Sequence, residues 1–353
     1  MSLELKTVNE NDAREWDRIV GACPHSTIFH TWRWLKIVEK QTRTCLYPLM
    51  AYRGTTIKGI YPIFLKKKGF IKLAYSPPPN AYLFYLGPVI PGYEAMKQDK
   101  KESTLIQLQE DVDRFLFSEL GCKYVRIRSS PGLPDFRPFK WRGYGVEPMH
   151  TYRINLKGGA EHVWEQFDRK LRVDINRTAR EKVQVEEGSM EDLEFIYSSF
   201  YRRLIELGSR PSDYNGYLTE LYKEFHPDNM KIFIASRNGE KVGGVISLCY
   251  KDTMRLWMGT IKSNLKGLSP NDLAQWESIK WACSHGFDYY ENIDNGCDPR
   301  LRPFKSKYNP ELSIWFSLDK YSSNLYSIVK KSSNIFHNIL KKQKKSCQRP
   351  CYD

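Results

Sequence analysis

Apolar residues gather in two widely separated stretches of the chain that share one layout. Residues 46–54 and 59–65 form two apolar runs around a short polar turn, and residues 230–239 and 243–248 repeat the arrangement. In both copies the first run ends in Ala-x-Arg. Each copy predicts a β-strand, a Gly-containing turn and a second strand. The chain therefore contains one structural unit twice.

A second similarity between the two halves follows these predicted hairpins. Residues 120–127 match residues 285–292, because in both a helical pattern ends at Gly and a strand begins. Two such copies predict an α/β (α+β) fold of two tandem units, each a mixed, mostly antiparallel sheet flanked by helices. We expect the units at 1–148 and 149–320, with a separate segment at 321–353.

The remaining elements follow from the spacing of apolar residues. Strands are predicted near 46–52, 57–65, 70–75, 82–86, 122–129, 151–156, 231–236, 241–250, 253–259, 287–293 and 311–318. Two helices are predicted within 1–40, and others near 102–120, 160–182, 190–207, 214–225 and 270–286. For the last helix Ser269 is the expected N-cap, with Pro270 in the first turn and Asp272 completing a capping box.

The composition fits a globular protein with two cores. A length of 353 residues suits two domains, and a hydrophobic fraction of 41% excludes a disordered chain. No apolar stretch has the length of a signal peptide core or a membrane span, so we expect a cytoplasmic protein. The eight cysteines lack zinc-ligand spacing, and no metal site is expected.

The positive charge is unevenly distributed. Of the net charge of +14, the segment from Tyr321 onward supplies +6, from six Lys and one Arg against one Asp. The charge on the body suits phosphorylated or polyanionic partners, and surplus surface lysines explain it equally well. The segment 321–353 has the pattern of a basic amphipathic helix. It either contacts an anionic membrane surface or packs on the body with a solvated Lys tail.

The chain lacks the common catalytic signatures. No hydrolase triad, phosphate-binding P-loop or dinucleotide-binding glycine pattern is present. A loop that leads into the helix at 270–286 contains Asn264, Lys266, Gly267 and Ser269. A helix N-terminus after such a loop offers backbone N–H groups to a phosphate. The alternative is an ordinary strand-to-helix loop.

The order of elements resembles the GNAT acyltransferase fold, in which this loop receives the pyrophosphate of acyl-CoA. The whole chain resembles the Fem family of aminoacyl transferases, which add amino acids to the peptide of cell-wall precursors, and its relatives with a duplicated GNAT fold. The segments that carry this resemblance are His30-Thr31-Trp32-Arg33-Trp34-Leu35, Pro62-Ile63-Phe64-Leu65-Lys66-Lys67-Lys68, Tyr75-Ser76-Pro77-Pro78, Gly87-Pro88-Val89-Ile90, the basic stretch 169–183, Gly267-Leu268-Ser269-Pro270-Asn271 with Gln275-Trp276, and Gly296 followed by Pro303-Phe304-Lys305.

The resemblance implies an acyl transfer that forms an amide. It places Lys305 near the reacting carbonyl, where an ammonium group would stabilise the developing oxyanion. Asp294 and Glu291 lie near the end of the preceding strand, and either could accept the proton of the amine. The alternatives are a surface lysine in a basic loop and carboxylates that pair with Arg300 or Arg302.

Further residues suit a phosphorylated acceptor. Arg169, Arg172 and Arg180 share one face of the predicted helix, and Arg forks match phosphate oxygens, although a solvated helix face has the same pattern. Lys36, which follows Trp34, is a candidate phosphate contact from the first unit. By resemblance, Arg210 lies near where the acceptor binds.

We therefore expect an acyltransferase without a tightly bound cofactor. Its donor co-substrate is aminoacyl-tRNA or acyl-CoA, and its acceptor is an amine of a phosphorylated or lipid-linked cell-envelope or polysaccharide precursor. One alternative is an acyl-CoA-dependent GNAT N-acetyltransferase that acts on another amine. A non-catalytic RNA-binding protein is the alternative of a different class. It is less favoured, because most Tyr and Trp residues fall at core positions of the predicted elements.

Overall fold

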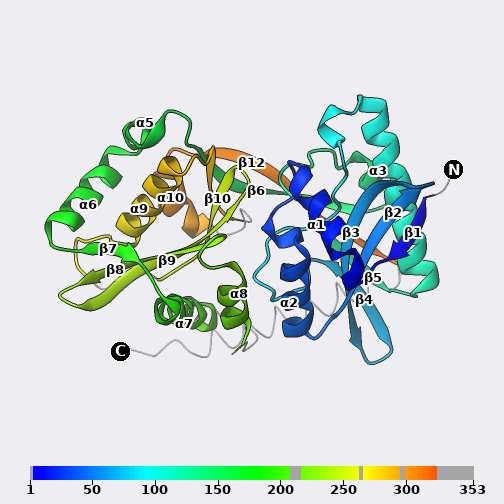
Figure 1. Cartoon of the computed structure of the whole chain (residues 1–353), viewed down its shortest axis with the longest axis horizontal. Coiled ribbons are helices and arrows are strands. Elements are labelled where there is room, and N and C mark those ends of the chain that lie inside the picture. Colours follow the sequence, from blue (N-terminus) through cyan, green and yellow to red (C-terminus); the bar gives the residue numbers. More distant parts are fainter. Residues whose placement is uncertain (1–2, 207–215, 262–264, 295–298, 324–353) are drawn as a thin grey trace, which may run out of the picture.

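One large β-sheet runs through the molecule. The structure is a computed structural model and describes residues 3–206, 216–261, 265–294 and 299–323. Within these residues twelve strands form a single sheet in the order β1-β2-β3-β4-β5-β12-β6-β11-β10-β9-β8-β7. Figure 1 shows two lobes of helices on this sheet, with β6 and β12 crossing between them.

The strands are β1 (Glu4–Thr7), β2 (Cys45–Arg53), β3 (Thr56–Lys68), β4 (Ile71–Ser76), β5 (Tyr124–Arg128), β6 (Gly145–Asn155), β7 (Gln184–Glu187), β8 (Met230–Arg237), β9 (Glu240–Tyr250), β10 (Thr253–Gly259), β11 (Tyr289–Asn292) and β12 (Glu311–Tyr321). The α-helices are α1 (Ala13–Ala22), α2 (Trp32–Thr42), α3 (Gln98–Asp113), α4 (Arg137–Trp141), α5 (Gly159–Gln166), α6 (Arg169–Arg180), α7 (Met190–Glu206), α8 (Tyr217–Phe225), α9 (Pro270–Ser284) and α10 (Arg302–Ser306). Short helical turns are η1 (Glu10–Asp12), η2 (Ile28–His30), η3 (Tyr93–Ala95), η4 (Arg114–Glu119) and η5 (Pro299–Leu301).

The repeat detected in the sequence is a repeat of strand order. Strands β2, β3 and β4 are antiparallel neighbours and β5 joins β4 in parallel, and β8, β9, β10 and β11 repeat this arrangement. The helix before β5 and the helix before β11 lead into Gly121 and Gly286, whose φ angles of 69° and 77° are left-handed. Such angles suit Gly, which has no Cβ. The predicted mixed α/β fold of two units is confirmed.

The two units exchange a strand. After β5 the chain continues into β6, which pairs with β11 of the second unit, and after β11 it continues into β12, which pairs with β5 of the first unit. The exchanged strands also pair with each other from Glu311↔Arg153 to Asp319↔Gly145. The hydrogen bonds of either unit's sheet are therefore complete only when the other unit is present. The boundary expected at 148/149 falls within β6.

Three apolar cores hold the helices to the sheet. One core lies in the second unit, one lies in the first unit and includes Phe316 and Leu318 of the exchanged strand β12, and the third contains helices and strands of both units. In this shared core Trp34 of α2 lies edge-on to Trp257 of β10, with ring centroids 5.7 Å apart. Trp34 also contacts Phe225 of α8. Burial of aromatic rings from both sides fixes the two units together.

Several local predictions were wrong. Residues 82–86 form no strand and make only an isolated bridge at Leu86. The predicted helix 160–182 is two helices, because Phe167 adopts an extended backbone and Asp168 caps α6 through the Lys170 N–H. The short edge strands β1 and β7 were not predicted, since four residues carry too little periodicity.

Within the described residues no helix is long and apolar enough to cross a membrane. The predicted basic helix at 321–353 lies almost wholly outside the described residues.

Candidate active site

Lys305 and Asp294 meet at the carboxyl end of β11. The Lys305 Nζ lies 3.0 Å from Asp294 Oδ2, and their side chains are 10% and 5% exposed. The same ammonium donates a hydrogen bond to the carbonyl oxygen of Ile293. Burial lowers the pKa of Lys305, while the negative charge of Asp294 acts in the opposite sense. The two residues predicted as catalytic are therefore in direct contact.

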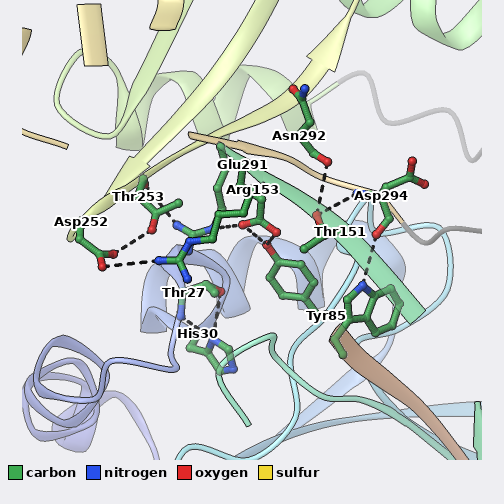
Figure 2. Close-up of polar contacts among 12 residues, drawn as sticks. Thr27, His30, Tyr85, Thr151, Arg153, Asp252, Thr253, Glu291, Asn292 and Asp294 are labelled. Atoms are coloured by element: carbon green, nitrogen blue, oxygen red, sulfur yellow. Dashed lines mark hydrogen bonds and ion pairs between the residues drawn. The ribbon is translucent and has the colours of Figure 1, made fainter. Parts of the chain in front are cut away.

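The exchanged strands hold Asp294 in place (Figure 2). Its backbone N–H donates to Thr151 Oγ1 of β6, and its carbonyl oxygen accepts from Trp315 Nε1 of β12, both at 3.3 Å. Thr151 Oγ1 also donates to the Asn292 carbonyl oxygen at 3.3 Å. The carboxylate next to Lys305 thus depends on both strands that cross between the units.

Glu291, the other carboxylate considered from sequence, has a different environment. Its Oε2 lies 2.9 Å from Nε of Arg255 on β10, and its carboxylate accepts a hydrogen bond from the Tyr85 hydroxyl at 2.9 Å. Figure 2 shows Tyr85 reaching this carboxylate from the first unit. Burial, followed by the charge of Glu291, raises the pKa of Tyr85 well above its usual value. Glu291 is thus part of a buried contact between the units.

A pair of buried amides, Gln275 and Asn292, was not identified from the sequence. Gln275 of α9 donates through Nε2 to Oδ1 of Asn292 at 2.8 Å. Both residues are fully buried, yet Gln275 Oε1 and Asn292 Nδ2 have no hydrogen-bond partner among the described residues. Buried polar atoms rarely stay unpaired. This amide pair can offer one acceptor and one donor to a bound molecule, and no sequence motif marks it.

The start of α9 differs from the prediction. Ser269 is the N-cap residue, but its side chain makes no capping hydrogen bond. Asp272 is buried and accepts instead from Lys307 Nζ at 2.6 Å and from the Tyr308 hydroxyl at 2.8 Å. The predicted capping box is therefore wrong, because tertiary contacts to the segment after α10 engage this carboxylate. The same contacts tie the start of α9 to the helix that carries Lys305.

The backbone donors at this helix start are mostly engaged. The Ser269 N–H donates to Thr178 Oγ1 of α6 at 2.9 Å, and those of Asp272 and Leu273 donate to the Ser269 carbonyl oxygen. Pro270 has no N–H. In the preceding loop, Lys266 and Gly267 are exposed, and Asn264 lies outside the described residues. The use of this loop for a donor phosphate stays a prediction.

The arginine face predicted on α6 is present as a helix surface. Arg169 and Arg180 are exposed, and Arg172 is half-buried with an Nε that has no hydrogen-bond partner. None of the three forms an ion pair within the described part of the chain. Thr178, which contacts Ser269, lies on the buried side of the same helix and faces away from these arginines. Phosphate binding by these residues stays a prediction.

Of the two remaining residues proposed for the acceptor, Lys36 lies away from this site. Lys36 is exposed on α2 and forms an ion pair with Glu39 of the same helix. The helix α2 packs against α8 and β2 rather than against α6 or α10. Arg210 lies outside the described residues. Lys305 contacts Asp294 directly, and the contacts of Asp272 with Lys307 and Tyr308 bring the start of α9 at Ser269 close to α10. No such contact connects Lys36 to this region among the described residues.

Comparisons with known proteins agree with this architecture. Residues 166–300 match the family model of the acetyltransferase (GNAT) domain. A comparison with curated protein sequences gives no match.

Solved structures resemble the chain over most of its length. FemX aligns with a TM-score of 0.66 at 14% identity, over 89% of this chain and 96% of FemX. L-PGS from Bacillus licheniformis aligns with a TM-score of 0.54 at 13% identity, over 92% and 97% of the two chains. The C-terminal domain of a putative lysylphosphatidylglycerol synthetase from Agrobacterium fabrum aligns with a TM-score of 0.54 at 12% identity, over 92% of this chain and 96% of that domain. The chain is thus an acyltransferase of the GNAT fold with the Fem-like architecture seen in FemX.

Proposed function

We propose that this acyltransferase transfers an aminoacyl or acyl group to an amine of a cell-envelope or polysaccharide precursor and so forms an amide. The observation that carries the proposal is the buried contact between Lys305 and Asp294. Similar folds in FemX and in lysylphosphatidylglycerol synthetase domains support an acceptor that is phosphorylated or linked to a lipid.

The proposed chemistry is a nucleophilic attack of the amine on the carbonyl carbon of the activated acyl group. The Lys305 ammonium stabilises the oxygen that becomes negative, an effect that typically contributes about 3 kcal/mol. Asp294 keeps this ammonium charged against the effect of burial and accepts the proton that the amine loses. The tetrahedral intermediate then collapses to the amide and expels the donor's carrier as the leaving group.

The two units have different roles in this proposal. The second unit, residues 149–320, carries Lys305, Asp294 and the Arg169, Arg172 and Arg180 face for phosphates. The first unit, residues 1–148, provides a wall for the acceptor, and Arg210 of the second unit is a phosphate contact. The basic segment after Tyr321 gives peripheral contact with an anionic membrane on its cytoplasmic side.

Aminoacyl-tRNA is the favoured donor. Acyl-CoA would place its pyrophosphate at the loop containing Asn264, Lys266, Gly267 and Ser269. The backbone donors of Ser269, Asp272 and Leu273 already have partners within the protein, which leaves this helix start few groups for a phosphate. The match of residues 166–300 to the acetyltransferase domain favours acyl-CoA as the second candidate.

Thermal unfolding in the presence of each donor distinguishes the two candidates. A rise in melting temperature with aminoacyl-tRNA, and none with acetyl-CoA, is expected. Stabilisation by micromolar acetyl-CoA would instead establish acyl-CoA as the donor.

Transfer of a labelled amino acid to nucleotide-linked and lipid-linked cell-wall peptides then tests the chemistry. Lys305→Gln should lower the rate by about 100-fold or more, as expected for the loss of an oxyanion contact. Lys280→Gln is the matched control, because Lys280 lies on the outer side of α9 in an ion pair with Glu277. Full activity of Lys305→Gln would remove Lys305 from the mechanism.

A further inference from the structure

The hairpin between β3 and β4 ends in an aromatic side chain that the fold does not use. Phe70 is 97% exposed, more than any other large apolar side chain among the described residues. It makes no aromatic contact within them. An isolated exposed apolar residue is ordinary, but this one stands at the turn of a hairpin and is followed by Ile71, which is half-buried.

Lysines surround this tip. Lys66, Lys67 and Lys68 precede the turn and Lys72 follows it. Lys67 lies directly opposite Lys72 in the strand ladder, an arrangement in which like charges repel. Lys72 donates to the carbonyl oxygen of Leu120, and none of these four lysines forms an ion pair within the described residues.

The surrounding elements add charge of the same sign. The Lys123 N–H bonds to the Lys72 carbonyl oxygen at 2.8 Å, so a further exposed lysine adjoins the hairpin. The acidic residue next to the Leu120 contact is Glu119, which is also exposed. The sum of five lysines and one glutamate leaves a strong positive potential around an apolar tip.

The β3–β4 hairpin lies at the same end of the strands as the carboxyl end of β12. β12 ends at Tyr321, which pairs with Tyr124 directly after Lys123. The sequence beyond Tyr321 carries six Lys and one Arg against one Asp. Figure 1 shows the β3–β4 hairpin projecting beyond the helices of the first unit.

We propose that the β3–β4 hairpin, residues 66–72 with Lys123 beside it, docks the protein on an anionic lipid surface. Phe70 enters the boundary between headgroups and acyl chains, while the lysines bind lipid phosphates. This hairpin is a second membrane-binding surface, in addition to the basic segment after Tyr321 proposed above. The test of this hairpin uses vesicles and no substrate. A negative result would therefore contradict membrane docking by the hairpin and would not bear on the proposed acyl transfer.

A lipid surface fits this hairpin better than RNA does. Base stacking uses an aromatic ring that neighbouring side chains hold as a platform, whereas Phe70 projects from a turn without ring neighbours. The hairpin contains lysines and no arginine, and the Arg fork is the group suited to fixed phosphate geometry in nucleic acids. Mobile lysine charges around an apolar tip suit a diffuse headgroup layer.

The experiment measures partitioning of the full chain onto vesicles by co-sedimentation. Vesicles of phosphatidylcholine are compared with vesicles that contain about one-third phosphatidylglycerol. Binding to the anionic vesicles is expected, with a decrease as salt rises. Since one lysine near such a surface changes partitioning by a factor of about five, Lys67→Gln/Lys68→Gln should weaken binding about 25-fold. Phe70→Ser should weaken it about tenfold.

Two matched variants control for charge and for exposed aromatic surface. Lys97→Gln/Lys100→Gln removes two exposed lysines at the far end of the helix that leads to Leu120. Trp141→Ser removes an aromatic side chain that is 57% exposed outside the hairpin. Both should bind vesicles as the unaltered chain does.

Three outcomes would overturn the proposal. They are an absence of binding to anionic vesicles, binding that the hairpin variants do not weaken more than the controls, and hairpin variants that lose affinity for tRNA while keeping it for vesicles. The substituted side chains are exposed, so an unchanged melting temperature should confirm that each variant is folded.

Discussion

The Lys305 ammonium lies 3.0 Å from Asp294 Oδ2 at a point where neither side chain is more than one-tenth exposed. Replacing one partner of such a buried ion pair with an uncharged residue strongly lowers the free energy of unfolding, because the other charge stays in the interior without a counter-charge. The contact therefore makes a prediction about stability that does not depend on the substrate.

Lys305→Met should destabilise the protein by about 3 kcal/mol, because Asp294 is left buried without its ion-pair partner. The double variant Lys305→Met/Asp294→Asn should recover most of this loss. Urea unfolding of the two single variants and the double variant gives the coupling energy. Additive effects of the two substitutions would show that the pair is not coupled.

The neutral form of His30 should make stability depend on pH. Burial lowers the pKa of His30 to about 3, with the charge of His25 acting in the same sense. Its Nδ1 accepts the Thr27 N–H at 3.1 Å, which requires an unprotonated nitrogen. Below its ordinary pKa of 6.5 the unfolded chain binds a proton that the folded chain does not, so stability falls as pH decreases.

This effect amounts to about 2 kcal/mol between pH 6.5 and about pH 5. Unfolding by urea across this range measures it, with His30→Gln as the variant that lacks the titrating ring. The slope of stability against pH should be smaller in His30→Gln. An equal slope in both proteins would contradict a neutral, buried His30.

The exchange of β6 and β12 predicts that the two units do not fold separately. A chain that ends at residue 323 retains all of β12, whereas a chain that ends at residue 310 lacks the strand that pairs with both β5 and β6 and joins them. The first should give a cooperative thermal transition like that of the full chain. The second should show no such transition by circular dichroism, and a normal transition would mean that β12 is dispensable.

Tyr85 and Arg255 should contribute unequally to the buried contact at Glu291. Tyr85→Phe removes one hydrogen bond and leaves the ion pair, at a cost of about 1–2 kcal/mol. Glu291→Gln leaves the Arg255 guanidinium buried without a counter-charge, and should cost about 3–5 kcal/mol. Urea unfolding compares the two variants, and the reverse order would show that the ion pair adds little.

The strongest local patterns predicted the fold well. The Gly-containing hairpins at 46–65 and 230–248 are β2–β3 and β8–β9, and the helix-to-strand junctions at Gly121 and Gly286 are as expected. These features depend on contacts between residues close in sequence. The capping box at Asp272 was wrong for the opposite reason, because Tyr308 and Lys307, more than thirty positions later, engage its carboxylate.

The candidate site was predicted only in part. Resemblance directed attention to Lys305, and its position near the end of a predicted strand to Asp294. The structure puts the two residues in contact. The amide pair of Gln275 and Asn292 had no sequence signal, because amides in a helix and a strand interior look like ordinary polar positions. Glu291 appeared equivalent to Asp294 in sequence, yet contacts with Tyr85 and Arg255 separate their roles.

Periodicity and turn residues act over short distances, so they were enough to predict that this protein contains one α/β unit twice. The exchange of β6 and β12, which joins the two units in one sheet, became evident from the three-dimensional structure alone. Which strands pair across a long stretch of sequence depends on which strands become neighbours in the folded sheet. The local pattern of apolar residues does not contain this information. The same exchange fixes the end of β11, through Thr151 and Trp315, and so positions Asp294 beside Lys305.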